Sequence, residues 1–294
     1  MDDKCWNCPL KKGTREGHFS NGEYQELVQL LEERNIRTLF QPIISLRDGR
    51  VLGYEGLSRG PRGHNLETPS VLFAAGEKYN KVWELELLCR VKALEKAAYM
   101  SEGKLLFLNV DPKIIYDERF QKGITKEMLR EHPVGADRIV FEITEKTAVD
   151  DYRNFRRVLE NYKSQGYQIA IDDMGSGWSG LKMLTEICPQ YIKIDMDLIR
   201  DIDKDAVKQA LMKAFCDFAR ITDRNIIAEG IETEGELDFL ISVGVPYGQG
   251  YFLQRPAEGF TTVSAEAQQR ILQKGHKLWG RLAVPSLKKL AGAF

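Results

Sequence analysis

Acidic and polar side chains end apolar, strand-like segments along the sequence: Glu55, Asn109, Glu142, Asp172, Asp173, Lys193, Glu229 and Gln249. Any one of them alone is simply explained as a turn residue or a helix cap. If their carboxylates meet at one place, they repel one another and raise each other's pKa values unless a cation lies among them. Carboxylate and amide oxygens favour Mg²⁺ or Mn²⁺, and the set lacks the histidine and cysteine that favour zinc. The pattern therefore predicts metal-assisted hydrolysis of a phosphoester.

Two details bear on how such ions would be held. Asp172 and Asp173 are adjacent, which fits a two-ion site in which Asp172 bridges both ions and Asp173, just past the strand, reaches one. The glycines that follow, Gly175 and Gly177, fit a flexible turn equally well. Lys193 lies inside an apolar segment. It would either hold the attacking water and stabilise charge on the phosphate, or serve as a structural ion-pair partner.

The segments that must position these residues alternate between strand-like and helical patterns. The strand-like segments cover residues 38–46, 51–57, 105–110, 138–143, 168–172, 191–194, 225–228 and 247–251. Helical patterns cover residues 21–34, 83–100, 152–165, 205–221, 235–243 and 265–282, with a short one starting near 179. The Asp48-Gly49 turn makes the first two strands antiparallel, and the later alternation predicts a parallel sheet flanked by helices. We therefore expect an α/β fold, a (β/α)8 TIM-like barrel with an antiparallel first strand and its catalytic groups at the C-terminal strand ends.

Composition narrows the class of protein. The 294 residues carry a formal net charge of −1, which argues against a protein that grips long nucleic acid through a dense basic face. We expect no membrane span, because no apolar run is long enough, and no signal peptide, because the chain starts with the polar sequence MDDKCWNCPL. The expected location is therefore cytoplasmic. The 5 cysteines are scattered and do not suggest a disulfide framework.

The expected boundaries divide the chain into three parts: an N-terminal tail with a C-x-x-C (1–19), the barrel (20–260), and a C-terminal helix with a basic tail (261–294). Cys5 and Cys8 are expected to be reduced thiols in the tail. A zinc or redox role would need partners, and His18 is the nearest candidate. The basic residues after 266 fit a solvated helix followed by a tail or a linker to a further domain, and a membrane-surface helix is the alternative.

The sequence closely resembles the EAL-domain family of cyclic di-GMP phosphodiesterases over roughly residues 39–256. The matching pieces, in order, are FQPIISL, YEGLSR, FLNVDP, FEITE, IDDMGSGWSGL, IKID, AEGIE and GQGYF. The resemblance implies hydrolysis of cyclic di-GMP to linear pGpG with one or two Mg²⁺ or Mn²⁺ ions. It also implies a homodimer and, in many members, a regulatory domain or partner protein.

The resemblance also implies roles for individual residues. The ligands of a first metal would be Glu55, Asn109, Glu142 and Asp172. Asp173 and Glu229 would hold a second metal that shares Asp172, and Glu229 is alternatively the general base. Lys193 would contact the catalytic water. The substrate-binding residues would be Arg59 on phosphate, Gln41 near guanine, Leu57 of the signature, and Gln249 lining the site, while Glu145 would support the loop after Asp173.

Three departures from the family pattern are visible, and all lie close to the expected site. Gly56 replaces the signature alanine, Trp178 replaces a tyrosine, and Gly180 replaces a serine. The last two fall in the loop after the paired aspartates, where the added glycine raises the entropy cost of ordering. Every expected metal ligand is present, which favours an active enzyme. The alternative is a catalytically inactive cyclic di-GMP receptor, because such receptors keep the pocket and lose signature acids.

Overall fold

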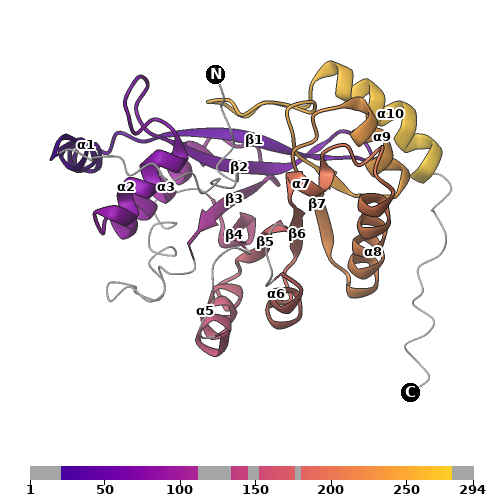
Figure 1. The fold of residues 1–294 in the computed structure, drawn as a ribbon, viewed down its shortest axis with the longest axis horizontal. Helices are drawn as coiled ribbons and strands as arrows, with labels where there is room; N and C mark the ends of the chain where they lie inside the picture. The colour runs from indigo at the N-terminus through magenta and orange to yellow at the C-terminus, as the bar shows by residue number, and fades with distance from the viewer. Residues whose placement is uncertain (1–20, 112–133, 145–151, 176–179, 280–294) are drawn as a thin grey trace.

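Eight strands close into a barrel in chain order, in a computed structural model that describes residues 21–111, 134–144, 152–175 and 180–279. The strands are β1 (Arg37–Ser45), β2 (Val51–Arg59), β3 (Leu105–Val110), β4 (Ile139–Thr144), β5 (Gln168–Met174), β6 (Tyr191–Ile194), β7 (Asn225–Ala228) and β8 (Tyr247–Gly248). β1 is antiparallel to both of its neighbours, β2 and β8. The remaining neighbours pair in parallel. The predicted barrel with an antiparallel first strand is confirmed (Figure 1).

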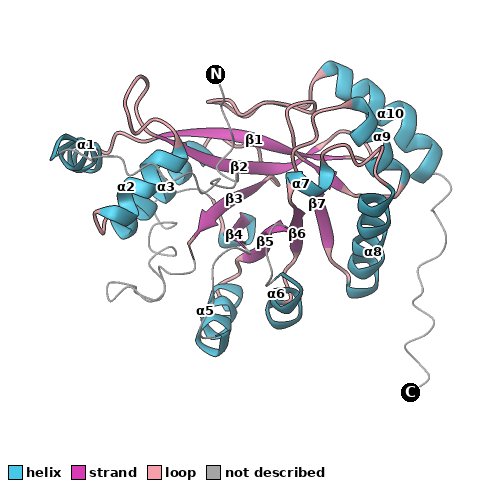
Figure 2. Ribbon diagram, viewed as in Figure 1, coloured by secondary structure: helices cyan, strands magenta, loops and turns pink. Residues whose placement is uncertain are grey.

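Helices surround the barrel and connect its parallel strands (Figure 2). They are α1 (Asn21–Glu32), α2 (Pro69–Lys78), α3 (Val82–Ala97), α5 (Tyr152–Ser164), α6 (Gly180–Ile187), α7 (Met196–Ile199), α8 (Ala206–Thr222), α9 (Glu234–Ser242) and α10 (Ala265–Trp279), with a 3₁₀ turn, η2 (Ala136–Arg138). α1, α2 and α3 gather on one side of the barrel, whereas α9 and α10 lie together on another (Figure 1). No helix in the described ranges is long and apolar enough to cross a membrane.

Two helices and one strand end differ from the sequence prediction. α2 begins with Pro69 after the N-cap Thr68, a start signal that its weak amphipathic pattern obscured. α7 is a single short turn capped by Asp195, whose Oδ1 accepts a hydrogen bond from the Asp197 N–H at 2.8 Å. β8 was expected to reach residue 251 but ends at Gly248. Just beyond its end, the chain at Gly250 passes so close to Ile231 that a Cβ would lie 2.2 Å from the Ile231 carbonyl oxygen.

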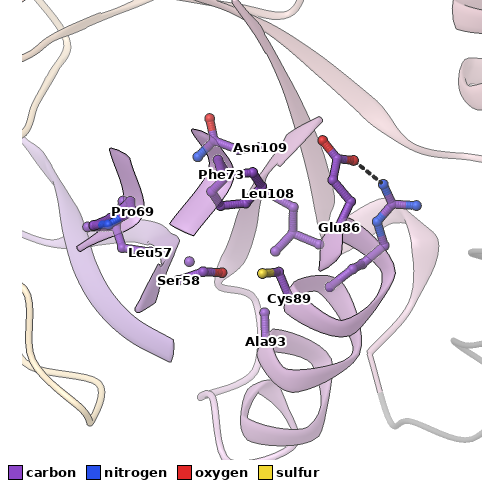
Figure 3. Close-up of a pocket in the computed structure, with 11 residues that line it drawn as sticks. Leu57, Ser58, Pro69, Phe73, Glu86, Cys89, Ala93, Leu108 and Asn109 are labelled. Atoms are coloured by element: carbon purple, nitrogen blue, oxygen red, sulfur yellow. Dashed lines mark ion pairs between the residues drawn. The ribbon is translucent and has the colours of Figure 1, made fainter. Parts of the chain in front are cut away.

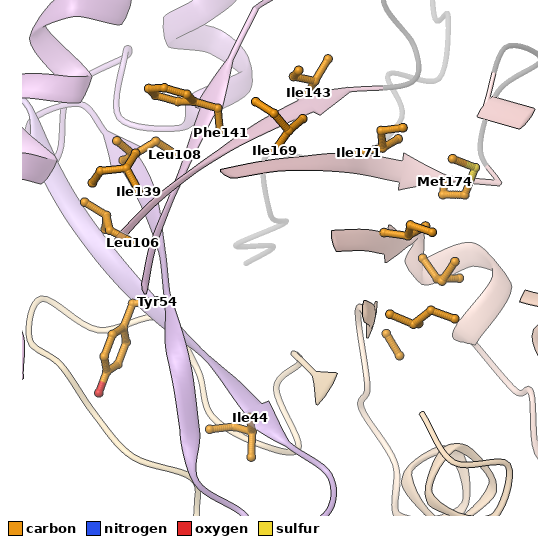
Figure 4. Close-up of a cluster of buried hydrophobic side chains, with 14 of the residues drawn as sticks. Ile44, Tyr54, Leu106, Leu108, Ile139, Phe141, Ile143, Ile169, Ile171 and Met174 are labelled. Atoms are coloured by element: carbon orange, nitrogen blue, oxygen red, sulfur yellow. The ribbon is translucent and has the colours of Figure 1, made fainter. Parts of the chain in front are cut away.

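The core has two layers, which follow from the alternation of side chains along each strand. Residues such as Leu106, Leu108, Phe141, Ile169 and Ile171 face outward and are buried against the helices (Figure 4). The residues between them face inward, where a smaller apolar cluster fills the barrel: Ile43, Phe107, Val140, Ala170, Tyr191 and Ile227. This inner cluster forms an apolar floor beneath the C-terminal ends of the parallel strands.

Candidate active site

The predicted polar residues stand directly above this apolar floor. On each parallel strand from β3 to β7, the polar residue comes two positions after a residue of the inner cluster. The pairs are Phe107 and Asn109, Val140 and Glu142, Ala170 and Asp172, Tyr191 and Lys193, and Ile227 and Glu229. Because side chains two apart share one face of a strand, the polar set shares the barrel interior with the apolar floor. β1 runs the other way, so Gln41 reaches the same layer by preceding Ile43 and pairs in register with Glu55 of β2.

Lys193 lies at the centre of this polar layer. Its Nζ lies 2.7 Å from Glu142 Oε1, 2.8 Å from Glu229 Oε1 and 3.0 Å from Asp172 Oδ1. Glu55 Oε2 is slightly farther away, at 3.5 Å. The side chain of Lys193 is fully buried. The ion-pair arrangement that its place in an apolar strand suggested is therefore present, and its role toward a catalytic water stays a prediction.

Burial and mutual repulsion shift the protonation of these groups. Burial raises the pKa of Glu142 well above its ordinary value, Lys193 opposes the shift, and Glu55 adds to it. Burial likewise raises the pKa of Glu229 well above its ordinary value, and the neighbouring Asp172 adds to the effect. For Lys193, burial alone would lower the pKa, but the surrounding carboxylates together raise it well above its ordinary value. The lysine is therefore charged, and Glu142 and Glu229 are unusually ready to hold protons.

A local irregularity of β5 explains how two consecutive aspartates face one site. Neighbouring residues on a regular strand point to opposite faces. Between Ile171 and Met174, however, the pairing of β5 with β6 is interrupted, and Asp173 adopts a left-handed backbone with φ of 57°. Asp172, Asp173 and Glu229 each offer a carboxylate oxygen, and these oxygens lie within 4.8 Å of one another. A non-glycine residue held in this backbone region at a cluster of acids is typical of a functional site.

Hydrogen bonds fix the side chains around Glu55 at the barrel mouth, the end of the barrel where the parallel strands have their C-terminal ends. Asn109 Nδ2 donates to Glu55 Oε1 at 3.1 Å, and Gln249 Nε2 donates to Glu55 Oε2 at 2.7 Å. Gln249 Nε2 also donates to Gln41 Oε1 at 2.9 Å, and Gln41 Nε2 donates to the Gln254 carbonyl at 3.1 Å. Both oxygens of Glu55 are thus oriented by amide side chains from opposite neighbours.

The donor set fits a hard divalent cation. Among the described residues, no hydrogen-bond donor is found for the buried atoms Asn109 Oδ1 and Glu142 Oε2. Buried oxygens of this kind ordinarily have a partner, and a missing one points to an ion or a water. The layer also places four carboxylates around the ammonium of Lys193, and the carboxylate of Asp173 lies beside two of them, those of Asp172 and Glu229. Oxygen ligands with excess negative charge are what Mg²⁺ and Mn²⁺ prefer.

The remaining predicted residues lie at the rim or outside the described chain. Leu57 is buried and, together with Asn109 and Ser58, lines a pocket between the ends of β2 and β3 and the helices α2 and α3 (Figure 3). Arg59, at the end of β2, is half-buried and donates from Nη1 to the Ser58 carbonyl at 2.9 Å. Glu145 and Trp178 lie outside the described residues, as do Cys5 and Cys8.

The sequence pattern missed one charged pair in this pocket. Glu86 and Arg90 on α3 line it together with Asn109 and are buried, at 5% exposure each. Their spacing of four residues would have marked them as an ordinary pair on a helix surface. The helical pattern alone contains no signal that places them against the barrel mouth.

Comparison with known proteins agrees with this geometry. The EAL domain family model matches residues 24–256. The chain is 29% identical over 237 residues to the bifunctional diguanylate cyclase/cyclic di-GMP phosphodiesterase MucR of Pseudomonas aeruginosa, a match that covers 79% of this chain and 34% of MucR. The chain therefore spans about a third of the length of this curated relative.

Solved structures show the same likeness. A standalone EAL protein from Vibrio cholerae O395, in its c-di-GMP bound form, is 34% identical with a TM-score of 0.68, covering 79% of this chain and 97% of that one. BlrP1 of Klebsiella pneumoniae, in a manganese/cy-diGMP complex, is 29% identical with a TM-score of 0.72, covering 78% of this chain and 58% of that one. The family match over most of the chain, together with the barrel and its acidic mouth, shows that the chain belongs to the EAL domain family.

Proposed function

We propose that this chain hydrolyses cyclic di-GMP to linear pGpG with Mg²⁺ or Mn²⁺. The observation that carries the proposal is the convergence of Glu55, Glu142, Asp172 and Glu229 on Lys193 at the barrel mouth, with Asp173 beside Asp172 and Glu229. The Vibrio cholerae neighbour was solved with c-di-GMP bound, which supports the choice of substrate. The residue set is also complete, and this favours an enzyme over an inactive receptor.

The metal ligands would form two sets that share Asp172. Glu55, Asn109, Glu142 and Asp172 would hold one ion, and Asp173 and Glu229 a second ion that shares Asp172. Bound there, the ions would neutralise phosphate charge and lower the pKa of a water. Leu57, Gln41 and Gln249 would contact the nucleotide, and Arg59 its phosphate.

The chain's own residues would then handle the proton and the developing charge. Glu229 would accept a proton from the attacking water at a carboxylate oxygen. The ammonium of Lys193, 2.8 Å from Glu229 Oε1, favours the ionised form that can accept it. As the new bond from water to phosphorus forms, the bond from phosphorus to the 3′ oxygen breaks, which leaves a 5′-phosphate and a 3′-hydroxyl in pGpG.

The proposal extends to parts of the chain beyond the site. We propose that residues 20–260 are the catalytic unit and that the segments 1–19 and 261–294 lie outside it. A homodimer, a supporting role of Glu145 for the loop after Asp173, and control by a regulatory domain or partner follow from the family resemblance. Gel filtration with light scattering tests the dimer directly, and a monomer at all concentrations would contradict it.

Chromatography of the reaction products tests the proposed activity. The full chain, stripped of metal with a chelator, is incubated with cyclic di-GMP and either Mn²⁺ or Mg²⁺, and the nucleotides are separated. We expect pGpG to form only when metal is added back, and Glu55→Ala or Asp173→Asn to abolish it. Asp217→Asn is the matched control, because Asp217 pairs with Arg220 on the surface. Tight binding without turnover in both metals would show a receptor instead.

Substitution of Lys193 separates its two expected roles. If Lys193 acts on the transition state, Lys193→Met lowers kcat far more than it weakens nucleotide binding. Both quantities are measured on the same preparation, after circular dichroism has confirmed the fold. Equal losses in kcat and binding would remove Lys193 from the catalytic step and leave it as a structural ion-pair partner.

A further inference from the structure

Two oppositely charged residues are buried behind the barrel mouth, on the helix α3. Glu86 and Arg90 are each 5% exposed, and Arg90 Nη2 lies 3.7 Å from Glu86 Oε2 (Figure 3). The guanidinium of Arg90 lies over the ring of Phe141, 5.4 Å from its centroid, and Phe141 directly precedes the proposed ligand Glu142. Buried charges are costly even when they are paired, so a pair kept at this place needs a reason.

The second oxygen of Glu86 provides that reason. Glu86 Oε1 accepts a hydrogen bond of 2.8 Å from the backbone N–H of Asp111. Asp111 comes directly after β3 and two residues after Asn109. The pairing of β3 with β2 ends at Leu108, whereas its pairing with β4 continues through Asn109 to Val110. The Glu86 carboxylate therefore anchors the chain one residue beyond β3, past the last pair that β3 makes with either neighbour.

We propose that Glu86 is a positioning residue for Asn109: by holding the Asp111 amide, it fixes the end of β3 so that the Asn109 side chain stays aimed at Glu55 and the metal position. The inference rests on the proposed function, since it needs Asn109 to be a metal ligand. Arg90 supports Glu86 by supplying the opposite charge. Groups that orient a ligand in this way commonly matter for metal affinity almost as much as the ligand itself.

A purely structural role makes the opposite prediction about two conservative variants. If Glu86 serves only to neutralise Arg90, its charge matters and its length does not. If Glu86 positions Asn109, its reach to the Asp111 amide matters more than its charge. Glu86→Gln keeps an acceptor oxygen at the same reach and loses the charge. Glu86→Asp keeps the charge but withdraws the carboxylate by one carbon–carbon bond, about 1.5 Å.

Calorimetric titration of the chelator-treated full chain with Mn²⁺ distinguishes the positioning role of Glu86 from the purely structural one. We expect Glu86→Asp to bind Mn²⁺ about tenfold more weakly than the wild type, at the lower end of the range for residues that orient metal ligands. Glu86→Gln is expected to stay within about threefold, because it can still accept the amide hydrogen bond. Glu95→Asp is the matched control on the same helix, because Glu95 pairs with Lys92 at the surface.

A second pair of variants approaches the same bond from the donor. Asp111→Pro removes the N–H while Glu86 and Arg90 stay in place. The preceding Val110 is already in a strand, the conformation that a following proline requires. Asp111→Ala keeps the N–H and removes only the side chain. We expect Asp111→Pro to weaken Mn²⁺ binding as Glu86→Asp does, and Asp111→Ala to weaken it less. This pair decides the matter if Glu86→Asp does not fold.

A double-mutant cycle tests whether the effect runs through Asn109. In an Asn109→Ala background, Glu86→Asp should weaken Mn²⁺ binding no further, because the side chain that it orients is gone. Additive losses would overturn the inference, and so would a larger loss in Glu86→Gln than in Glu86→Asp, or wild-type affinity in both Glu86→Asp and Asp111→Pro. These outcomes concern Mn²⁺ binding alone. If the variants rank in Mn²⁺ affinity as expected but the wild-type chain forms no pGpG, the proposed activity is refuted and the positioning role of Glu86 stands.

Discussion

Lys193 and Glu142 form an ion pair in which neither side chain has exposed surface, with Nζ 2.7 Å from Oε1. Three further carboxylates, of Asp172, Glu229 and Glu55, approach the same nitrogen. Taking these charges out of water is costly, and their mutual attraction offsets the cost only while the cation is present. Lys193 is therefore the chain's own counter-charge in a site where a divalent ion would add to it.

Removing that counter-charge should make the fold depend on metal. We expect Lys193→Met to lower the free energy of unfolding of the metal-free protein by about 3–5 kcal/mol, because it leaves buried carboxylates without their partner. Added Mn²⁺ should raise the Tm of Lys193→Met more than it raises the Tm of the wild type, since ion binding then replaces the positive charge that Lys193 supplied. The measurement is thermal unfolding with chelator and with Mn²⁺.

The control for this experiment is Lys204→Met. Lys204 pairs with Asp201 on the surface, where both side chains are more than half exposed. Exposed pairs contribute about 1 kcal/mol or less. A Lys193→Met protein as stable as the control, with the same response to Mn²⁺, would show that the buried lysine does not balance the carboxylates.

Gln249 orients Glu55, and its loss should reduce turnover without unfolding the barrel. Gln249→Leu keeps the approximate volume and removes the 2.7 Å hydrogen bond to Glu55 Oε2. A hydrogen bond to a charged group contributes about 1.5–3 kcal/mol, so we expect kcat/KM to fall about ten- to hundredfold. Gln29→Leu is the control, because Gln29 bonds Glu33 on an exposed helix face. Unchanged kcat/KM in Gln249→Leu would mean that Asn109 and Lys193 are sufficient to hold Glu55.

The sequence predicted the polar layer because the layer follows from strand alternation. Once β3 to β7 are recognised, Asn109, Glu142, Asp172 and Glu229 must share a face, since each stands two residues beyond an apolar inward residue. Lys193 belongs to the same face, but the pattern could not decide between a catalytic and an ion-pairing role. That choice depends on the distances from Lys193 to the carboxylates of Glu55, Glu142, Asp172 and Glu229, which come from four other strands.

Other features could not be predicted because they depend on contacts between elements. The left-handed backbone of Asp173 arises where β5 loses its pairing with β6, and an Asp-Asp pair is equally compatible with an ordinary turn. Glu86 and Arg90 look like a surface pair on a helix, and only the packing of α3 against β3 buries them. The close approach of Gly250 to Ile231, just past the short β8, likewise depends on a contact between separate segments. The local sequence pattern was sufficient to locate the strands, whereas these details depend on how the elements pack in the folded chain.

Gly56 and Gly53 lie on the same strand, β2, and should respond differently to alanine. A Cβ at Gly56 would lie 3.3 Å from Leu108 Cδ2 and 3.5 Å from Ala93 Cβ, so only the flexible end of a leucine must shift. We expect Gly56→Ala, which restores the usual signature alanine, to change the free energy of unfolding by less than about 1 kcal/mol, because lower chain entropy offsets the slight crowding. The kcat should stay within about twofold, or about 0.4 kcal/mol, because the nearest neighbours of the added methyl are Leu108, Ala93 and Phe107 and none is a proposed metal ligand.

Gly53→Ala is the contrasting variant in the same urea-unfolding experiment. Its Cβ would lie 2.3 Å from the backbone oxygen of Leu105, which cannot move without breaking the pairing of β2 with β3. We expect a loss of about 2 kcal/mol or more, the upper part of the range for overpacked sites. If Gly56→Ala proved as harmful as Gly53→Ala, the glycine of this signature would have a role in the backbone rather than simply leaving a methyl-sized space.

The ion pairs between α9 and α10 should give a stability difference that depends on pH. Asp238 Oδ1 accepts a hydrogen bond from Arg270 Nε at 2.6 Å, and its Oδ2 contacts Lys274 Nζ at 2.8 Å. Partial burial alone would raise the pKa of Asp238, but the hydrogen bonds from Arg270 and Lys274 lower it below its ordinary value. A carboxyl whose pKa is lower in the folded state stabilises the fold above its unfolded pKa, about 3.9, and loses that contribution as pH falls through the folded value.

Urea unfolding of Asp238→Asn should therefore show two regimes. At pH 7 we expect the variant to be about 1 kcal/mol less stable than the wild type, because a partly exposed, charge-assisted pair contributes about that much. As the pH falls below about 3.9, the difference should shrink toward zero, because the wild-type carboxyl takes up a proton as the pH passes its lowered pKa. Asp217→Asn, whose Arg220 partner is exposed, should differ little from the wild type at pH 7 or at acid pH. Acids such as Glu142 titrate identically in both proteins and cancel in the comparison. A difference that persisted unchanged through the acid range would mean that Asp238 holds α10 through its shape rather than its charge.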